Sequence, residues 1–357
     1  MTPFIVLLGI PILLSPLTEH TTINRVNLSK VPLFLFFMML TVLVMLRHRY
    51  VGNDTSSYIH FFQAFSRMSW TRLEKHSLEV GYKVLNKGLS MLSNEPQFFL
   101  AVTGAAVSAM IYPTYRRACV DAPLTIVLFC SMVTFPMMFS GIRQMLAVGI
   151  GCIAYAFVRR KKPIPFLIAV AAAMSIHTSA FMLLPMYPLY RTRITKKWLY
   201  VVVPALAVLF VFNRQVFYVL GRLLQSYTEY DVVETATGAY TILFLFAAFA
   251  VFSFVIPDES QMDEETSGMR NYLLLALAIQ MFAPLNVLAM RMSYYFIIFI
   301  PLLIPRIIRC SRERYRSIAS AGRIIMLAFF FLYFFATAKA GSRLHIIPYH
   351  FYWEYYR

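Results

Sequence analysis

Three short polar segments interrupt long apolar stretches of the chain, and each contains a side chain that can do chemistry. They are Ser140-Gly141-Ile142-Arg143-Gln144, Ser175-Ile176-His177-Thr178 and Met290-Arg291-Met292-Ser293. An ionisable residue at the edge of hydrocarbon is costly, so it faces a partner or a polar cavity more often than lipid. Arginine pairs with anionic oxygens through parallel N–H groups, and histidine accepts a proton near neutral pH. The three segments therefore predict one anion site with a candidate base.

The elements that position these segments are predicted to be membrane helices. Of the 357 residues, 59% are hydrophobic and 14% are charged, which is typical of a polytopic helical membrane protein. Continuous apolar stretches, without alternation, argue against a membrane β-barrel. We predict an all-α fold with a single integral membrane domain over 1–357. About twelve hydrophobic segments are expected, near 2–17, 31–46, 96–112, 122–138, 142–158, 163–176, 178–190, 198–212, 238–256, 271–287, 292–305 and 322–338.

Several of these segments are too short for a full span, which predicts tilted, half-spanning or re-entrant helices. The basic clusters Arg116-Arg117, Arg159-Arg160-Lys161-Lys162, 191–197 and 306–316 fall on one side, which is then cytoplasmic. Both termini are predicted to face outward.

Three extramembrane regions follow from this orientation. The 47–95 loop faces outward and has the pattern of amphipathic helices lying on the outer leaflet. The 213–237 loop also faces outward. The acidic stretch 257–270 faces the cytoplasm and is predicted to be a solvated linker.

Composition and motifs exclude several classes of function. The net charge of +17 comes from loop clusters without a nucleic-acid-binding motif, so nucleic acid is not a predicted partner. The four cysteines form no C-x-x-C, which argues against a zinc site or a disulfide framework. No D-x-D, phosphate-binding-loop or H-E-x-x-H motif occurs, so no metal or cofactor is predicted. The first apolar segment lacks a basic n-region and a cleavage site, and we predict a mature span.

The candidate site residues share the predicted outer face: Arg47, Arg49, Asp54, Glu79, Arg143, His177 and Arg291. Arginines grouped at a membrane edge suggest a phosphate or pyrophosphate carried on a lipid. Arg143 and Gln144 open a helix after a Ser-Gly break, where free amides favour an anion. We favour His177 as the base or hydroxyl-orienting group, with Asp54 and Glu79 as the carboxylate candidates.

Each assignment has a structural alternative. Arg47 and Arg49 could only snorkel from the end of a span. His177 could be a core histidine bonded to Ser175 or Thr178. A purely structural Arg291 would need a carboxylate partner, and carboxylates are few on that side, which favours a ligand anion.

Five segments also carry a family resemblance. They are Arg47-His48-Arg49-Tyr50-Val51-Gly52-Asn53-Asp54-Thr55 with Tyr58, then Glu79-Val80-Gly81-Tyr82, Ser140-Gly141-Ile142-Arg143-Gln144-Met145-Leu146-Ala147, His177-Thr178-Ser179-Ala180 and Arg291-Met292-Ser293-Tyr294-Tyr295-Phe296. In this order and spacing, with an aromatic stretch at 348–352, the chain resembles the EpsG family of bacterial exopolysaccharide membrane proteins. Asn53 stands where a small hydroxyl residue is common.

The resemblance implies an activity, because the family is similar to Wzy-type polysaccharide polymerases. Such an enzyme is a metal-independent glycosyltransferase at the outer face of the bacterial inner membrane. It transfers a glycan from undecaprenyl pyrophosphate to a hydroxyl of a lipid-linked repeat unit. On this interpretation the pyrophosphate is held by Arg143, Arg291, Arg47, Arg49 and Gln144. The predicted substrate contacts are Tyr58, Tyr82 and Tyr294, and Asp54 and Glu79 bind sugar hydroxyls or hold the arginines.

The implied partners are undecaprenyl-pyrophosphate-linked oligosaccharides, membrane lipids, a flippase and a chain-length regulator. Three alternative functions stay open. A lipid-linked oligosaccharide flippase would be expected to have repeated halves and charges along a transmembrane path, whereas these charges collect on one face. A glycan acyltransferase would need a polar route for its acyl donor. An O-antigen-type ligase differs only in the acceptor.

Overall fold

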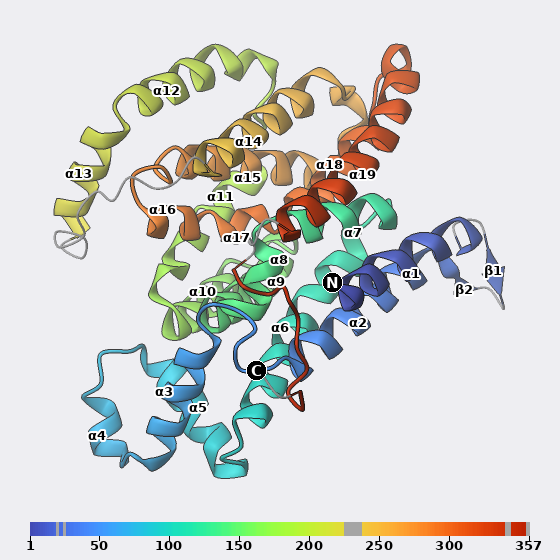
Figure 1. Ribbon diagram of the computed structural model, residues 1–357. Coiled ribbons are helices and arrows are strands. Elements are labelled where there is room, and N and C mark those ends of the chain that lie inside the picture. The colour runs from blue at the N-terminus through green and yellow to red at the C-terminus, as the bar shows by residue number, and fades with distance from the viewer. Residues whose placement is uncertain (19–20, 24–25, 225–237, 340–343, 355–357) are drawn as a thin grey trace. The chain divides into compact units, whose positions relative to one another are not determined.

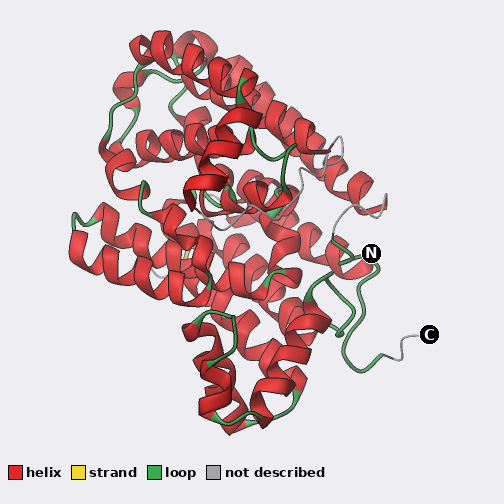
Figure 2. Cartoon of the chain, turned by 90° about the vertical axis from the view of Figure 1, so that its left-hand side faces the viewer, coloured by secondary structure: helices red, strands yellow, loops and turns green. Residues whose placement is uncertain are grey.

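The computed structural model describes residues 1–18, 21–23, 26–224, 238–339 and 344–354, and most of them are helical (Figures 1 and 2). The chain divides into two compact units, Met1–Leu184 with Gly322–Arg357 and Pro185–Ala321.

The elements of the first unit run in the order α1 (Thr2–Thr18), β1 (Thr22–Ile23), β2 (Val26–Asn27), η1 (Leu28–Lys30), α2 (Val31–Leu46), α3 (Thr55–Arg67), α4 (Trp70–Glu74), α5 (Val80–Leu92), α6 (Pro96–Ala118), α7 (Ala122–Ser131), α8 (Thr134–Ser140), α9 (Ile142–Arg159), α10 (Pro163–Ile176) and η2 (Thr178–Leu183). Those of the second unit are α11 (Met186–Arg191), η3 (Lys196–Trp198), α12 (Leu199–Val211), α13 (Asn213–Leu224), α14 (Gly238–Val255), η4 (Glu259–Gln261), α15 (Glu264–Gln280), α16 (Val287–Met292), α17 (Tyr294–Ile297), α18 (Ile300–Arg309) and η5 (Glu313–Tyr315). The last helix, α19 (Arg316–Lys339), begins in the second unit and continues in the first.

Within the described part of the chain, four helices are long and apolar enough to cross a membrane: Leu28–Leu46, Pro96–Ala118, Ile142–Arg159 and Glu313–Ala338. Three bent pairs raise the number to seven if each pair is one span: Ala122–Ser131 with Thr134–Ser140, Lys196–Val211 with Asn213–Val219, and Ala289–Ile297 with Ile300–Arg309. The prediction of a helical membrane protein is therefore confirmed, but the count of twelve segments is not. The apolar stretches at Thr2–Thr18, Pro163–Ile176 and Ala239–Val255 form shorter helices.

The core of the first unit is a group of packed helices with aromatic side chains between them. Helix α2 packs on α1 and α6, and α9 packs on α6 and α10. The Phe36 and Phe37 rings of α2 lie within 5.8 Å of the Phe129 ring of α7. The Phe36 pair is edge-to-face and the Phe37 pair is tilted, and aromatic contacts of this kind add to the energy of burial.

The predicted outer loop at 47–95 contains two amphipathic helices. Helix α3 buries Tyr58, Ile59, Phe62 and Phe65 on one face, and Figure 1 shows α3, α4 and α5 side by side. Two lysines of α5 bind the carbonyl ends of the other two helices. Lys83 donates to the Glu74 carbonyl at 2.9 Å, and Lys87 donates to the Ser66 and Met68 carbonyls at 2.9 and 2.8 Å. A cation at a helix C-terminus satisfies orphan carbonyls. The position of these helices on the outer leaflet stays a prediction.

The segment 344–354 pairs with the chain that leads from α2 to α3. The backbone N–H of His48 donates to the His350 carbonyl at 2.8 Å, and that of Tyr352 donates to the Leu46 carbonyl at 2.9 Å. The Tyr349 hydroxyl donates to the Leu43 carbonyl at 2.7 Å. This pairing gives a non-helical stretch of backbone its hydrogen-bond partners.

In the second unit, α15 packs against α11, α14, α17 and α18. Its Arg270 is buried and pairs with Glu259 at 2.6 Å, while Arg306 of α18 pairs with Asp263 at 2.6 Å. The sequence predicts a solvated linker at 257–270, but α15 begins at Glu264 and these carboxylates neutralise two buried arginines. A buried arginine without a counter-charge would be strongly destabilising. Of the predicted loop 213–237, α13 covers the first part, and 225–237 lies outside the described residues.

Candidate functional site

Glu79 lies at the centre of a polar cluster in the first unit. The carboxylate accepts from Nη1 of Arg143 at 2.7 Å and lies 3.3 Å from Nδ1 of His177. The backbone N–H of Thr178 also donates to it, at 3.0 Å. The cluster therefore unites three of the segments that the sequence singles out, from the start of α5, the start of α9 and the end of α10.

A close helix approach brings Glu79 to His177. Glu79 occupies the N-cap position of α5, and Gly81 in the first turn faces Ser175 of α10. A Cβ atom at Gly81 would lie 2.3 Å from the Ser175 hydroxyl oxygen and 2.7 Å from its carbonyl oxygen. Only glycine permits this approach without moving backbone, which gives a physical reason for the glycine in the Glu79-Val80-Gly81-Tyr82 segment.

Gly81→Ala is therefore expected to destabilise the protein by about 1–3 kcal/mol, the usual cost of overpacking, because the backbone of Ser175 cannot yield as a side chain would. Thermal unfolding of the purified protein measures this. Gly88→Ala is the matched control, since Gly88 lies in the same helix with nothing within 4 Å of its added Cβ. Alanine there should be neutral or stabilising by up to about 1 kcal/mol. Equal melting shifts in the two variants would contradict the role of the close approach.

Two of the predicted substrate tyrosines, Tyr82 and Tyr58, contact the guanidinium of Arg143. Its guanidinium carbon lies 5.6 Å from the centre of the Tyr82 ring, and the guanidinium donates to the Tyr58 hydroxyl. The two rings are 6.2 Å apart. Tyr82 is fully buried and Tyr58 nearly so, so in this structure both tyrosines orient Arg143. Their contact with a substrate stays a prediction.

The segment that carries Asp54 is hydrogen-bonded to residues 139 and 140, at the Ser140-Gly141 break before Arg143. The backbone N–H of Asp54 donates to the Ser140 hydroxyl at 3.2 Å, and the Thr55 hydroxyl donates to the Phe139 carbonyl at 3.0 Å. Gly52 has a φ of +92°, which favours glycine, and it packs against the backbone of Phe139. A Cβ atom at Gly52 would lie 2.7 Å from the Phe139 carbonyl oxygen. The structure thus brings the backbone of Asp54 to the same break as Arg143, and Asp54 as a residue is half-buried.

The other predicted pyrophosphate ligands have different surroundings. Arg47 is fully buried and donates to the Val44 carbonyl, so in this structure it has a structural position. Arg49 is exposed, with its guanidinium 5.7 Å from the Tyr50 ring. Gln144 is buried in the first turn of α9. Arg291 belongs to the second unit, where the neighbouring Tyr294 is buried, and its convergence with Arg143 stays a prediction.

The environment of Glu79 keeps its carboxylate ionised. Burial raises the pKa of Glu79, but hydrogen bonds from His177 and Thr178 and the charge of Arg143 outweigh burial and lower it to about 2. A carboxylate this acidic is a poor general base at neutral pH. It is well suited to orient the His177 ring and to fix Arg143.

Acid is expected to remove the stabilisation that Glu79 provides. Because the folded pKa is about 2 and the ordinary value is 4.5, this stabilisation is complete above pH 4.5 and is lost as the pH falls towards 2. Thermal unfolding between pH 6 and pH 2.5 should show a smaller acid loss in Glu79→Gln than in the wild type. Glu95→Gln removes an exposed carboxylate and should melt like the wild type. If Glu79→Gln retains the full acid loss, other carboxylates are responsible.

Several contacts of the site were not predicted from the sequence. The Thr178 backbone N–H, the Ser140 hydroxyl and the Tyr82 ring each hold a predicted residue, but none of them has a charge that would single it out. Among the described residues, no group of three or more His, Cys, Asp or Glu side chains could hold a metal ion.

Comparison with known proteins gives one match. The model of the EpsG family matches residues 30–351. No curated protein and no solved structure matches the chain.

Proposed function

This chain belongs to the EpsG family, and on that premise we propose that it is a Wzy-like polysaccharide polymerase. The family makes it an exopolysaccharide-related membrane protein. The proposed donor is a glycan on undecaprenyl pyrophosphate, and the proposed acceptor is one repeat unit on the same lipid. The reaction would take place at the outer face of the bacterial inner membrane, with a flippase supplying the units and a chain-length regulator as a further partner.

The observation that carries this proposal is the cluster of Arg143, Glu79 and His177. Glu79 neutralises Arg143 through Nη1 only, while Nε of Arg143 is buried and has no hydrogen-bond partner in the described part of the chain. A buried donor without a partner costs free energy, and a pyrophosphate oxygen would satisfy it. A guanidinium aimed at a leaving pyrophosphate stabilises the charge that develops there.

The chemistry can be assigned to these groups. An acceptor hydroxyl attacks the anomeric carbon, and the bond from that carbon to the pyrophosphate oxygen breaks. The hydroxyl proton passes to Nε2 of His177, and the electron pair leaves with the pyrophosphate, whose charge Arg143 balances. If Nδ1 of His177 carries its proton towards Glu79, Nε2 is the basic nitrogen. Arg291, Arg49 and Asp54 are further candidates for the pyrophosphate and the sugar hydroxyls.

The test is a reconstituted reaction. Purified protein in lipid nanodiscs is mixed with lipid-linked repeat units, and the products are separated by length. A ladder of increasing chain length is the expected result. A single transfer to a different lipid acceptor would indicate a ligase. Movement of intact lipid-linked oligosaccharide across proteoliposomes, with no lengthening, would indicate a flippase.

A further inference from the structure

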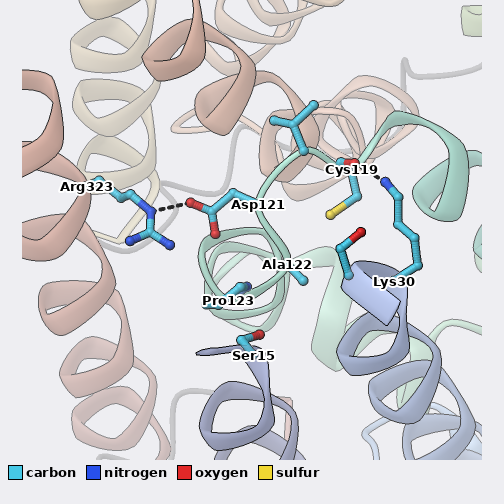
Figure 3. A pocket seen from close by; sticks show the side chains of 9 residues that line it. Ser15, Lys30, Cys119, Asp121, Ala122, Pro123 and Arg323 are labelled. Atoms are coloured by element: carbon cyan, nitrogen blue, oxygen red, sulfur yellow. Dashed lines mark hydrogen bonds and ion pairs between the residues drawn. The ribbon is translucent and has the colours of Figure 1, made fainter. Parts of the chain in front are cut away.

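A second polar cavity lies where several helix ends of the first unit meet. It has a volume of about 60 Å³ and is lined by side chains from α1, η1, the α6–α7 connection and α19: Ser15, Ser29, Lys30, Cys119, Asp121 and Arg323 (Figure 3). By the usual measure this is room for on the order of four waters, or for one phosphate group. None of these residues belongs to the Glu79 cluster.

The charges around the cavity favour an anion. Lys30 donates to the Cys119 carbonyl, and Arg323 donates to Asp121, as the dashed lines of Figure 3 mark. Asp121 also caps α7, because it accepts from the Leu124 N–H at 3.2 Å. Two cations against one carboxylate leave one positive charge, and the N-terminus of α7 adds the positive end of a helix dipole.

The bond to the Cys119 carbonyl does not use all the donors of Lys30. An ammonium has three N–H groups, and the Cys119 carbonyl accepts one from Lys30. If the two cations served only to join helices, closely packed side chains would fill the space between them. The lysine and the arginine instead border a space large enough for a ligand.

The position of the cavity identifies the source of the anion. The last turn of α6, just before Cys119, carries Arg116 and Arg117, which the positive-inside rule puts on the cytoplasmic side. Lipid head groups on that side are anionic, and basic pockets between membrane helices there bind them. Exposed apolar side chains lie next to the lining residues on α1 and α19: Leu13 and Leu17, and Ile324 and Ile325. A hydrocarbon chain attached to the bound phosphate would meet an apolar surface.

We propose that this cavity binds the phosphate of an anionic phospholipid of the cytoplasmic leaflet. Lys30 and Arg323 hold the phosphate oxygens, and the acyl chains lie along α1 or α19. Because this inference does not depend on the polymerase reaction, either proposal can fail without the other.

Native mass spectrometry of the purified full chain tests the proposal with phosphatidylglycerol, phosphatidylcholine and inorganic phosphate as separate ligands. The wild type should retain phosphatidylglycerol in preference to phosphatidylcholine. Lys30→Gln should weaken retention about fivefold, the effect of about 1 kcal/mol per basic residue near the membrane surface. Lys162→Gln is the control, because it removes an exposed lysine of the first unit from the same predicted side.

A third variant changes binding in the opposite direction. Asp121→Asn keeps a good helix cap but removes the negative charge, so it should tighten phosphatidylglycerol binding about fivefold, which a misfolded variant would not do. Equal retention of the two lipids, or equal weakening by Lys30→Gln and Lys162→Gln, would overturn the proposal. Displacement of the lipid by millimolar inorganic phosphate, without preference for phosphatidylglycerol, would overturn the assignment to a lipid.

Discussion

Arg143→Lys is expected to lose nearly as much polymerising activity as Arg143→Ala, with both about 10²- to 10³-fold below the wild type. This is the usual loss when one donor that stabilises transition-state charge is removed. Lysine keeps the charge but lacks the planar pair of N–H directions. Arg143 uses one nitrogen for Glu79 and holds a buried Nε without a described partner. An ammonium has three N–H groups, but all of them lie on one atom, so it cannot place donors at both of these separate positions. The measurement is the rate of chain lengthening in nanodiscs, at equal protein levels.

The control separates catalysis from folding. Loss of Arg143 leaves Glu79 with a half-buried negative charge, so Arg143→Ala with Glu79→Gln should recover thermal stability without recovering activity. Recovery of both would show that Arg143 only neutralises Glu79. An Arg143→Lys variant with full activity would show that the residue supplies only charge.

His177→Ala is expected to abolish lengthening, with a loss of about 10²- to 10⁴-fold, while lipid-linked substrate still binds. General bases contribute on this scale, and the acidic Glu79 cannot replace the imidazole. Glu79→Gln should have a smaller effect, because the amide can still accept a hydrogen bond from the ring but no longer supports the imidazolium. The products are measured with purified lipid-linked repeat units, and bound substrate is measured separately.

His60→Ala is the matched control, since His60 is an exposed histidine of α3. It should lengthen chains normally. If His177→Ala also does so, and Asp54→Asn stops the reaction, Asp54 takes the role of base. Normal lengthening in both variants would remove the proposed site from the chemistry.

Sequence patterns predicted the helices well where their ends are chemically marked. The segment 31–46 coincides with α2, and 163–176 coincides with α10, because a proline opens each helix and polar residues follow it. The bend of 60° between α7 and α8 was not predicted, because the apolar residues of 122–138 predict one continuous segment, although Ser131 and Thr134 flank the break. A hydrophobic pattern predicts which segment is buried, but it does not show where the helix axis bends within that segment.

The site was predicted in part for a similar reason. Arg143 and His177 are singled out by their cost at a membrane edge, and Glu79 as a carboxylate on the same predicted face. The structure shows Glu79 in contact with both. The burial of Arg47 was not predicted, because it depends on the pairing of 344–354 with the chain after α2. A single sequence does not show which residues far apart in the chain form backbone hydrogen bonds with each other. The snorkelling alternative also assumed an arginine that reaches water, whereas Arg47 lies inside.

The pairing of 344–354 with residues 46–53 has a consequence for the order of events during synthesis. The ribosome makes the segment that leads to Asp54 early, but its backbone partners at Leu344 and His345 emerge only after nearly all the membrane helices. Until then the N–H groups of Gly52 and Asn53 must be satisfied by water or by the insertion machinery. The loop that carries Asp54 therefore reaches its final geometry late, after translation has passed the last helix. A nascent chain stalled before that point would have inserted helices but an unfinished site.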